Sequence, residues 1–130
     1  MEQQQKNKEF IINFYNALGG IPKTRALMEK YITDEALIGH IEFFETAFPC
    51  YEVYIDEMMA EGNRVLLQAR MKGTHLGDLG GIPPTHKTVD FPFVVRYEIE
   101  DNKIVSHWML ADQMALMEQL GVVPAAEAVH

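Results

Sequence analysis

Hydrophobic positions in the first third of the chain recur with the spacing of an α-helix. One apolar stripe covers residues 9–18 and ends at two glycines, which predicts a first helix with a glycine C-terminus. Pro22 suits the first turn of a second helix that is expected to run to about Tyr31. Thr33 or Asp34 is a suitable N-cap for a third helix, expected to end at Phe48 because Pro49 follows.

From residue 51 onward the period changes to the alternation of a β-strand. Four segments alternate, over residues 51–61, 63–75, 87–99 and 104–112, and a loop rich in glycine and proline spans 77–86. A short helical pattern covers 112–120, and the tail after Gly121 is expected to be loose. Helices followed by an antiparallel sheet predict an α+β fold, with residues 1–130 as one domain. A curved sheet wrapped on helices would leave a pocket at its mouth.

The last expected strand, IVSHWMLAD, carries the first candidate for chemistry. Simple alternation places Trp108 and Asp112 on one face, and Val105, His107 and Met109 on the other. A carboxylate beside apolar side chains has a raised pKa and can act as a general acid or base. Alternatively, Asp112 only caps the following helix. By the same alternation, His107 is expected on the outer face of the sheet, beside Val105 and Met109. This half-apolar face would suit a dimer interface, unless a bulge reverses the alternation.

A second titratable candidate, His75, ends the apolar face of its strand. It is a candidate partner for Asp112 if both groups open onto one apolar cavity, although a histidine in this position can equally be a hydrogen-bonded core residue. Candidate wall residues are Met71, Phe91 and Phe93 from the apolar strand faces and Phe44 from the third helix. His40, on the same helix, could line the rim of the pocket.

Composition narrows the classes of partner. The net charge is −8, with 19 acidic against 11 basic residues, which argues against binding to nucleic acid or to an anionic membrane. Cys50 is the only cysteine, and no Cys/His cluster indicates a metal site. The polar start of the chain lacks a signal core, and no apolar run approaches the length of a membrane span, so a soluble cytoplasmic protein is expected.

Several short motifs are similar to those of a known family. They are the segments GTH at 73–75, GGIPPT at 80–85, NKIV at 102–105 and QLG at 119–121, together with His107-Trp108 and Asp112. In these motifs the chain resembles the SnoaL-like polyketide cyclase, or ester cyclase, branch of the nuclear transport factor 2-like superfamily. The resemblance implies a cone-shaped α+β barrel with a deep apolar pocket, as a homodimer.

The resemblance also implies roles for individual residues. In the polyketide cyclases an aspartate is the acid and base of an intramolecular aldol ring closure, without metal or cofactor, and that role maps onto Asp112. His75 matches the family's pocket histidine, Trp108 matches an aromatic residue that lines the pocket, and Tyr15 would approach from the first helix. His86 departs from the pattern, because the family commonly has glycine at this position of the loop.

Three functions are therefore open from the sequence. The first is a cyclase or isomerase that uses Asp112 and His75 on a small apolar molecule with a carbonyl group. The second is a protein that binds a small hydrophobic ligand without turnover, with Asp112 as a polar anchor or helix cap. The third is a hydrolase or hydratase of the epoxide-hydrolase type, ranked lower because such chemistry needs several polar groups to hold a water.

Overall fold

The computed structural model describes residues 2–123 and confirms the predicted α+β fold. Three helices come first, then four strands, then a last helix. Their bounds are α1 (Glu2–Leu18), α2 (Arg25–Glu29), α3 (Glu35–Ala47), β1 (Glu52–Glu61), β2 (Arg64–Thr74), β3 (Thr88–Glu100), β4 (Lys103–Ala111) and α4 (Gln113–Leu120). Helix α1 begins earlier than its apolar stripe predicts, because the polar residues before it are good helix formers. Most of the tail that was expected to be loose lies outside the described residues.

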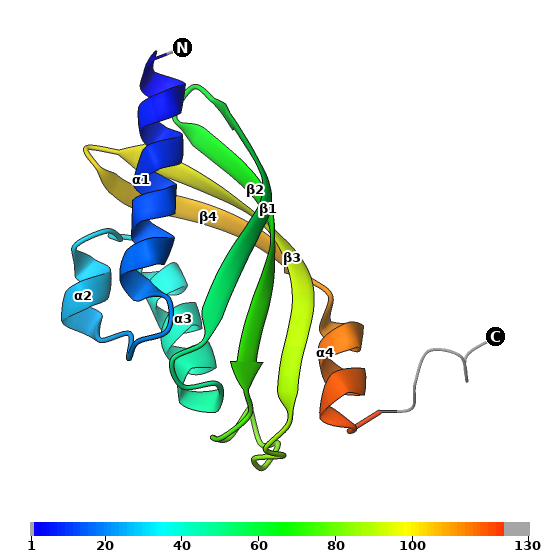
Figure 1. The fold of residues 1–130 in the computed structure, drawn as a ribbon. Coiled ribbons are helices and arrows are strands. Elements are labelled where there is room, and N and C mark those ends of the chain that lie inside the picture. Colours follow the sequence, from blue (N-terminus) through cyan, green and yellow to red (C-terminus); the bar gives the residue numbers. More distant parts are fainter. Residues whose placement is uncertain (1, 124–130) are drawn as a thin grey trace.

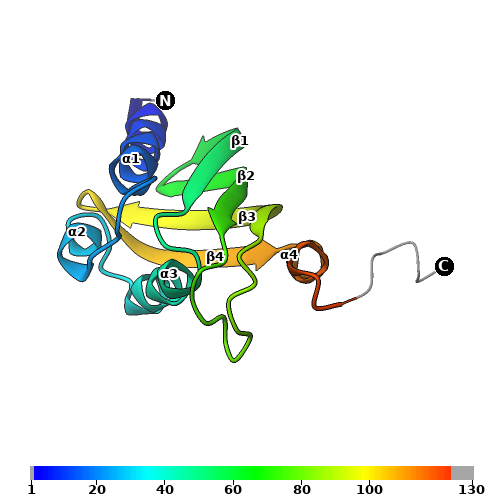
Figure 2. The same ribbon diagram turned by 60° about the horizontal axis from the view of Figure 1, so that its bottom comes forward.

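The strands form one antiparallel sheet in the order β1-β2-β3-β4. Tight turns join β1 to β2 and β3 to β4. The second turn has positive φ at both Asp101 and Asn102, as a two-residue hairpin turn requires. The sheet is strongly curved, helices α1 to α3 lie on its concave side, and α4 follows β4 at the far end of the sheet (Figures 1 and 2). No helix within residues 2–123 has both the length and the hydrophobicity needed to cross a bilayer.

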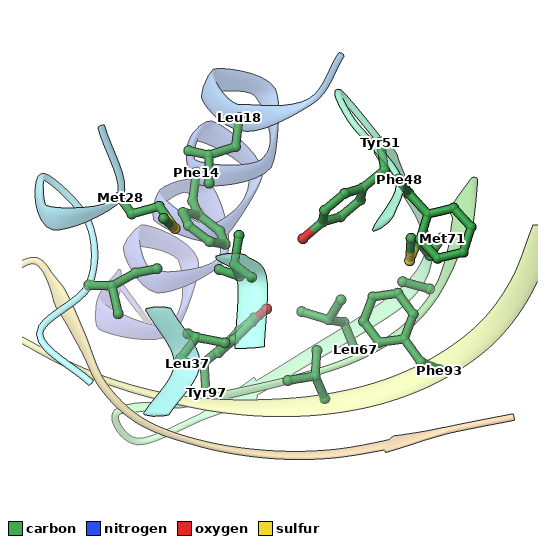
Figure 3. Packing of buried hydrophobic residues seen from close by; sticks show 14 of the residues in the cluster. Phe14, Leu18, Met28, Leu37, Phe48, Tyr51, Leu67, Met71, Phe93 and Tyr97 are labelled. Carbon is green, nitrogen blue, oxygen red and sulfur yellow. The ribbon is translucent and has the colours of Figure 1, made fainter. Parts of the chain in front are cut away.

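The core lies between the concave face of the sheet and the helices. The alternation predicted for β2 and β3 is confirmed, because the apolar positions of both strands are buried and the intervening positions are not. Figure 3 shows how these side chains meet residues from the helices. The buried set includes Phe14 and Leu18 of α1, Met28 of α2, Leu37 and Ile41 of α3, Leu67 and Met71 of β2, and Phe91, Phe93 and Tyr97 of β3.

A β-bulge at Val105 changes which residues of β4 face the core. Ile104 pairs with Ile99 and Ser106 pairs with Glu98, so Val105 is an extra residue without a partner on β3. Beyond it His107 pairs with Tyr97, a buried residue of the inner face. Trp108 and Leu110 are 50% and 64% exposed. The predicted faces of this strand are therefore wrong: His107 lies on the inner side of the sheet, and Trp108 lies on the outer side.

The start of α3 is attached to β4 beside this bulge. Ile32 forms a parallel bridge with Ile104, and the backbone N–H groups of Thr33 and Asp34 both donate to the Ile104 carbonyl, at 3.0 and 3.3 Å. The Asp34 side chain accepts from the N–H groups of Ala36 and Leu37, so Asp34 is the N-cap, one of the two residues predicted. This attachment fixes the helix that carries His40 relative to the inner face of β4.

Gly77 lies where the loop after β2 passes the end of α3. A Cβ at this position would stand 2.0 Å from the carbonyl oxygen of Thr46, which is a backbone atom. The N–H of Gly77 also donates to the carbonyl of Ala47, so the loop is held close to the helix. Gly39, in the middle of α3, is different, because a Cβ there would meet nothing within 4 Å.

We expect alanine at these two glycines to have opposite effects on stability. Gly77→Ala should lower the free energy of unfolding by about 1–3 kcal/mol, the usual cost of forcing extra atoms into a packed site. Gly39→Ala should raise it by up to about 1 kcal/mol, because alanine is the better helix former. Urea denaturation of both variants measures these changes, and a Gly77→Ala protein as stable as the unchanged protein would contradict the close contact.

Candidate functional site

A cavity of about 350 Å³ lies between the helices and the concave face of the sheet. Most of its wall is apolar, with contributions from all sides of the fold. The wall consists of Phe14, Tyr15, Leu18, Gly19, Lys23, Leu37, His40, Ile41, Phe43, Phe44, Tyr51, Val53, Met71, Leu79, Gly80, Ile82, Phe91, Phe93, Tyr97, Met109, Ala111, Gln113 and Met117. A space of this size and character suits a small, mainly hydrophobic molecule.

The structure places most of the expected pocket residues on this wall. Tyr15, His40, Phe44, Met71, Phe91 and Phe93 all line the cavity. Their role in binding a substrate stays a prediction. Trp108 does not line the cavity, because the bulge in β4 directs its side chain to the outer face of the sheet.

Asp112 is not part of the cavity wall. It is exposed, and its carboxylate accepts a hydrogen bond of 2.9 Å from the N–H of Ala115, which makes it the N-cap of α4. This is the alternative role that the sequence left open for Asp112. The apolar surroundings predicted for its carboxylate are absent from this structure, because the bulge exchanges the two faces of β4 and places Asp112 on the outer face of the sheet.

His75 is fully buried, yet it also stays outside the cavity wall. Its Nδ1 accepts from the N–H of Thr85 at 3.1 Å, so the ring hydrogen is on Nε2, which has no hydrogen-bond partner among the described residues. The backbone of His75 also bonds to Lys87 and His86. The ring packs on Phe48 with centroids 5.3 Å apart. His75 therefore holds the two ends of the 77–86 loop together. Neither His75 nor Asp112 lines the cavity, so the condition under which the sequence made them candidate partners is not met in this structure.

The hydroxyl groups of two tyrosines are polar groups on the otherwise apolar cavity wall. The hydroxyl groups of Tyr15 on α1 and Tyr97 on β3 are hydrogen-bonded to each other. Burial is the main cause that raises the pKa of both, so both remain protonated at neutral pH. One O–H is used within the pair, which leaves the other free to donate to a bound molecule.

A third phenol, Tyr51, enters the cavity from the residue before β1. Figure 3 shows its hydroxyl and that of Tyr97 pointing toward one another across the space between helices and sheet. Burial raises the pKa of Tyr51 as well. Lys23 lies 4.0 Å above its ring and donates to its carbonyl at 2.7 Å and to Glu45 at 3.2 Å. Through these contacts the Lys23 ammonium is fully hydrogen-bonded and holds Tyr51 in place.

His40 is the one imidazole on the cavity wall among residues 2–123. It projects from α3 beside Phe44, with ring centroids 4.9 Å apart. Burial, and secondarily the charge of His107, lower the pKa of His40 below its ordinary value of 6.5. The ring is therefore neutral at pH 7 and has a nitrogen available to accept a proton.

His107 lies next to this wall and is paired with a carboxylate. Its Nδ1 stands 2.6 Å from Oδ2 of Asp34, and both side chains are mostly buried.

The sequence indicated this orientation of His107 only through the possibility of a bulge. Lys23 and Tyr51 gave no comparable signal, because a lysine in a loop and a tyrosine at a strand end are usually exposed. Tyr97 lies on the apolar face of the alternating segment 87–99, and that pattern alone indicates a core residue.

Within the described range, no group of three or more His, Cys, Asp or Glu side chains is arranged to hold a metal ion. The polar side chains on the cavity wall are the tyrosines Tyr15, Tyr51 and Tyr97, the imidazole of His40, Lys23 and Gln113.

Comparison with solved structures shows the same fold in several bacterial proteins. AclR from Streptomyces galilaeus, a candidate hydroxylase, matches with a TM-score of 0.81 and 22% identity over 97% of this chain and 87% of that chain. A candidate SnoaL-like polyketide cyclase from Jannaschia sp. matches with a TM-score of 0.78 and 23% identity over 93% and 95%. IdmH from Streptomyces antibioticus, a candidate polyketide cyclase, matches with a TM-score of 0.73 and 20% identity over 88% and 98%.

No curated protein matches the sequence. The family model described as SnoaL-like polyketide cyclase matches residues 23–120, which includes α2, α3, the whole sheet and α4. The match thus covers most of the chain and nearly every element that forms the cavity. The chain belongs to the SnoaL-like polyketide cyclase family.

Proposed function

We propose that the protein is an enzyme of the cyclase or isomerase type that acts on a small apolar molecule carrying a carbonyl group. The observation that carries this proposal is the meeting of a phenol pair, Tyr15 and Tyr97, and a neutral imidazole, His40, in one apolar cavity. A phenol in such surroundings can stabilise the negative oxygen of an enolate. A neutral imidazole can remove the proton that forms it.

The reaction proceeds in two proton transfers. His40 takes a proton from the carbon next to the carbonyl. The electron pair of that C–H bond forms a C=C bond, and the π pair of the carbonyl moves to its oxygen, which accepts a hydrogen bond from the phenol pair. The enolate carbon then attacks a second carbonyl of the same molecule and closes a ring. Alternatively, in a substrate with a neighbouring C=C bond, the conjugated dienolate is protonated at a more distant carbon, which shifts the double bond. The imidazolium returns its proton to the new alkoxide or to carbon, so the enzyme ends unchanged.

Binding without turnover is the second candidate. One observation favours it: no carboxylate is found on the cavity wall among the described residues, although the cyclase mechanism implied by the family uses one. The same apolar cavity would then hold a small hydrophobic ligand, with the tyrosines as hydrogen-bond donors. The experiments below separate the two candidates, because only an enzyme exchanges protons with the molecule it binds.

The first test replaces the proposed base. The bicyclic ketone β-tetralone serves as the probe, and NMR in D₂O follows exchange of its α-protons. His40→Asn should slow the protein-catalysed exchange by about 10²–10⁴-fold, the usual contribution of general-base catalysis. His86→Asn is the matched control, because His86 is exposed in the loop and asparagine tolerates its positive φ. Binding of the probe without exchange in the unchanged protein would favour the second candidate.

The pH dependence of this exchange gives the second test. A base must be unprotonated, so the rate should rise with pH and level off above the pKa of His40. Because that pKa is lowered, the midpoint of the acid limb of kcat/KM should fall below 6.5. A midpoint at or above 6.5 would contradict His40 as the base.

The third test concerns the phenol pair. Tyr15→Phe should reduce the exchange rate by about 10²-fold with little change in β-tetralone affinity, because an enolate gains more than a ketone from the lost hydrogen bond. Tyr54→Phe is the matched control, since the Tyr54 hydroxyl bonds to Glu52 on an exposed part of the sheet. Equal effects of both substitutions would remove the pair from the mechanism.

The catalytic role that the family resemblance implies for Asp112, with His75, stays a prediction, and one substitution decides between it and His40. Asp112→Asn keeps an oxygen that can cap α4, and asparagine is as good an N-cap as aspartate. If Asp112 acts only as a cap, the variant should retain full exchange activity and thermal stability. Loss of activity with unchanged stability would restore Asp112 as the acid–base residue.

We also propose that a second copy of the chain covers the outer face of the sheet. Met59 and Leu66, which pair across β1 and β2, join Trp108 and Leu110 of β4 in carrying large exposed apolar side chains, and Met59 is 64% exposed. Arg96 of β3 lies between Leu66 and Trp108 in the sheet, and Val94 lies beside Leu110, so the outer face combines large apolar side chains with a central charged one. Such a face can pack against its own copy about a two-fold axis. This replaces the face of Val105, His107 and Met109 that the sequence favoured for a dimer.

Trp108 reports directly on this contact, because it is the only tryptophan in the chain. Its fluorescence should shift to longer wavelength when the protein is diluted until the dimer dissociates. Leu110→Lys should produce a monomer by light scattering at any practical concentration, whereas Leu76→Lys, on the exposed loop, should not. A concentration-independent monomer with unchanged fluorescence would contradict the proposed dimer.

A further inference from the structure

Tyr51 is the tyrosine of the cavity wall whose hydroxyl has no role in the fold. The residue is only 8% exposed and lines the cavity, and its hydroxyl forms no hydrogen bond within residues 2–123. The hydroxyls of Tyr15 and Tyr97, by contrast, bond to each other. A buried hydroxyl normally has a partner, because an unpaired one costs free energy. A molecule in the cavity would supply the partner that Tyr51 lacks.

The position of Tyr51 is fixed from several sides. Its carbonyl accepts from Lys23 Nζ at 2.7 Å and from the N–H of Gly20 at 3.4 Å, and its own N–H donates to the carbonyl of Phe48 at 3.2 Å. The Lys23 ammonium also lies 4.0 Å from the centre of its ring. At Gly73 of β2 the backbone passes so closely that a Cβ would stand 3.1 Å from that of Tyr51. These contacts restrain the residue, so its hydroxyl is directed to one region of the cavity.

None of these contacts uses the phenol oxygen. A cation is attracted to the face of a phenylalanine ring as well as to that of tyrosine, and backbone hydrogen bonds do not depend on the side chain. Phenylalanine at position 51 would therefore satisfy the fold equally well, without an unpaired hydroxyl. What tyrosine adds at this position is a hydrogen-bond donor directed into an apolar space.

The Tyr51 hydroxyl faces the phenol pair across the cavity. Figure 3 shows the hydroxyls of Tyr51 and Tyr97 directed toward one another, and no hydrogen bond joins these two groups. Burial raises the pKa of all three phenols, so each carries its hydrogen at neutral pH. An oxygen of a bound molecule that lies between them can accept from both sides, because a carbonyl oxygen has two lone pairs.

We propose that Tyr51 is a second hydrogen-bond donor to the bound molecule, and that one oxygen of this molecule lies between its hydroxyl and the Tyr15–Tyr97 pair. The identification of that oxygen as a carbonyl rests on the function proposed above, whereas the two hydrogen bonds do not. When the carbonyl becomes an enolate, its oxygen is negative, and two donors from different directions stabilise it more than one. Tyr51 then touches the reacting group and is a catalytic residue.

The test uses a probe with one charged oxygen and a matched probe without it. Pentafluorophenol is a phenolate at neutral pH and imitates the oxygen of an enolate, and pentafluorobenzene lacks that oxygen. Fluorine NMR measures the affinity of the protein for both. Tyr51→Phe should weaken binding of pentafluorophenolate by about 10-fold or more, the value of a hydrogen bond to a charged group, and leave pentafluorobenzene binding unchanged.

Two further variants test whether both donors serve the same oxygen. Pentafluorophenolate has a single oxygen, so Tyr15→Phe should weaken its binding as Tyr51→Phe does. Tyr54→Phe is the matched control and should change neither affinity, because its hydroxyl bonds to Glu52 on an exposed part of the sheet. An effect of only one of the two cavity substitutions would contradict an oxygen that lies between the phenols.

Thermal denaturation separates a ligand-binding role of the hydroxyl from a structural one. Tyr51→Phe should be at least as stable as the unchanged protein, because no hydrogen bond within residues 2–123 is lost. A lower melting temperature, or equal weakening of pentafluorophenolate and pentafluorobenzene binding, would show that the hydroxyl serves packing and would overturn the inference. Unchanged affinity for pentafluorophenolate would overturn it as well.

Exchange of β-tetralone protons keeps this inference apart from the proposed function. In an active enzyme, Tyr51→Phe should slow exchange by about 10²-fold, the usual effect of losing one donor to a developing negative oxygen. If Tyr51→Phe weakens pentafluorophenolate binding and the unchanged protein catalyses no exchange, the second donor stands and the enzyme is excluded. If exchange is catalysed and neither exchange nor pentafluorophenolate binding responds to Tyr51→Phe, the enzyme stands and the second donor is excluded.

Discussion

One extra residue in β4 decides what faces the cavity. Side chains of a strand alternate, so an inserted residue exchanges the two faces for the remainder of the strand. With Val105 unpaired, His107, Met109 and Ala111 lie on the inner side, while Trp108 and Leu110 lie outside. An unbroken strand would have directed a tryptophan and a carboxylate into the apolar space. Ile104, beside the bulge, also bonds to the start of α3, so helix and strand are fixed together at the same point.

Desolvation determines the protonation states of the titratable side chains on the cavity wall. Burial in an apolar wall keeps the tyrosines protonated and His40 unprotonated, which are the states needed for a donor and a base. Buried phenols need hydrogen-bond partners, and Tyr15 and Tyr97 satisfy each other until a ligand arrives. Two polar side chains near the cavity have carboxylate partners: Lys23 pairs with Glu45, and His107 pairs with Asp34. The cavity itself can therefore remain apolar.

The fold could be predicted from the sequence because periodicity is a direct record of burial. The alternation in β2 and β3, the stripe of α3 and the N-cap at Asp34 all appear in the structure. Most expected pocket residues line the cavity for the same reason. The faces of β4 could not be predicted, since a bulge leaves little trace in composition. Nor does a sequence distinguish an aspartate that caps a helix from one that transfers protons, because both stand between a strand and a helix.

The hydrogen bonds of His75 close the 77–86 loop at its base. The middle of the loop can therefore change without altering the strands that the loop connects. His75 accepts hydrogen bonds from the N–H groups of Thr85 and His86 and donates its own N–H to the carbonyl of Lys87, which holds the two ends of the loop together at the sheet. Between them Leu79, Gly80 and Ile82 form part of the cavity wall. Substitutions in this segment can reshape the cavity wall without disturbing α1, which carries Tyr15, or β3, which carries Tyr97. The protein thus has a way to acquire a different range of ligands during evolution while the groups that handle protons stay where they are.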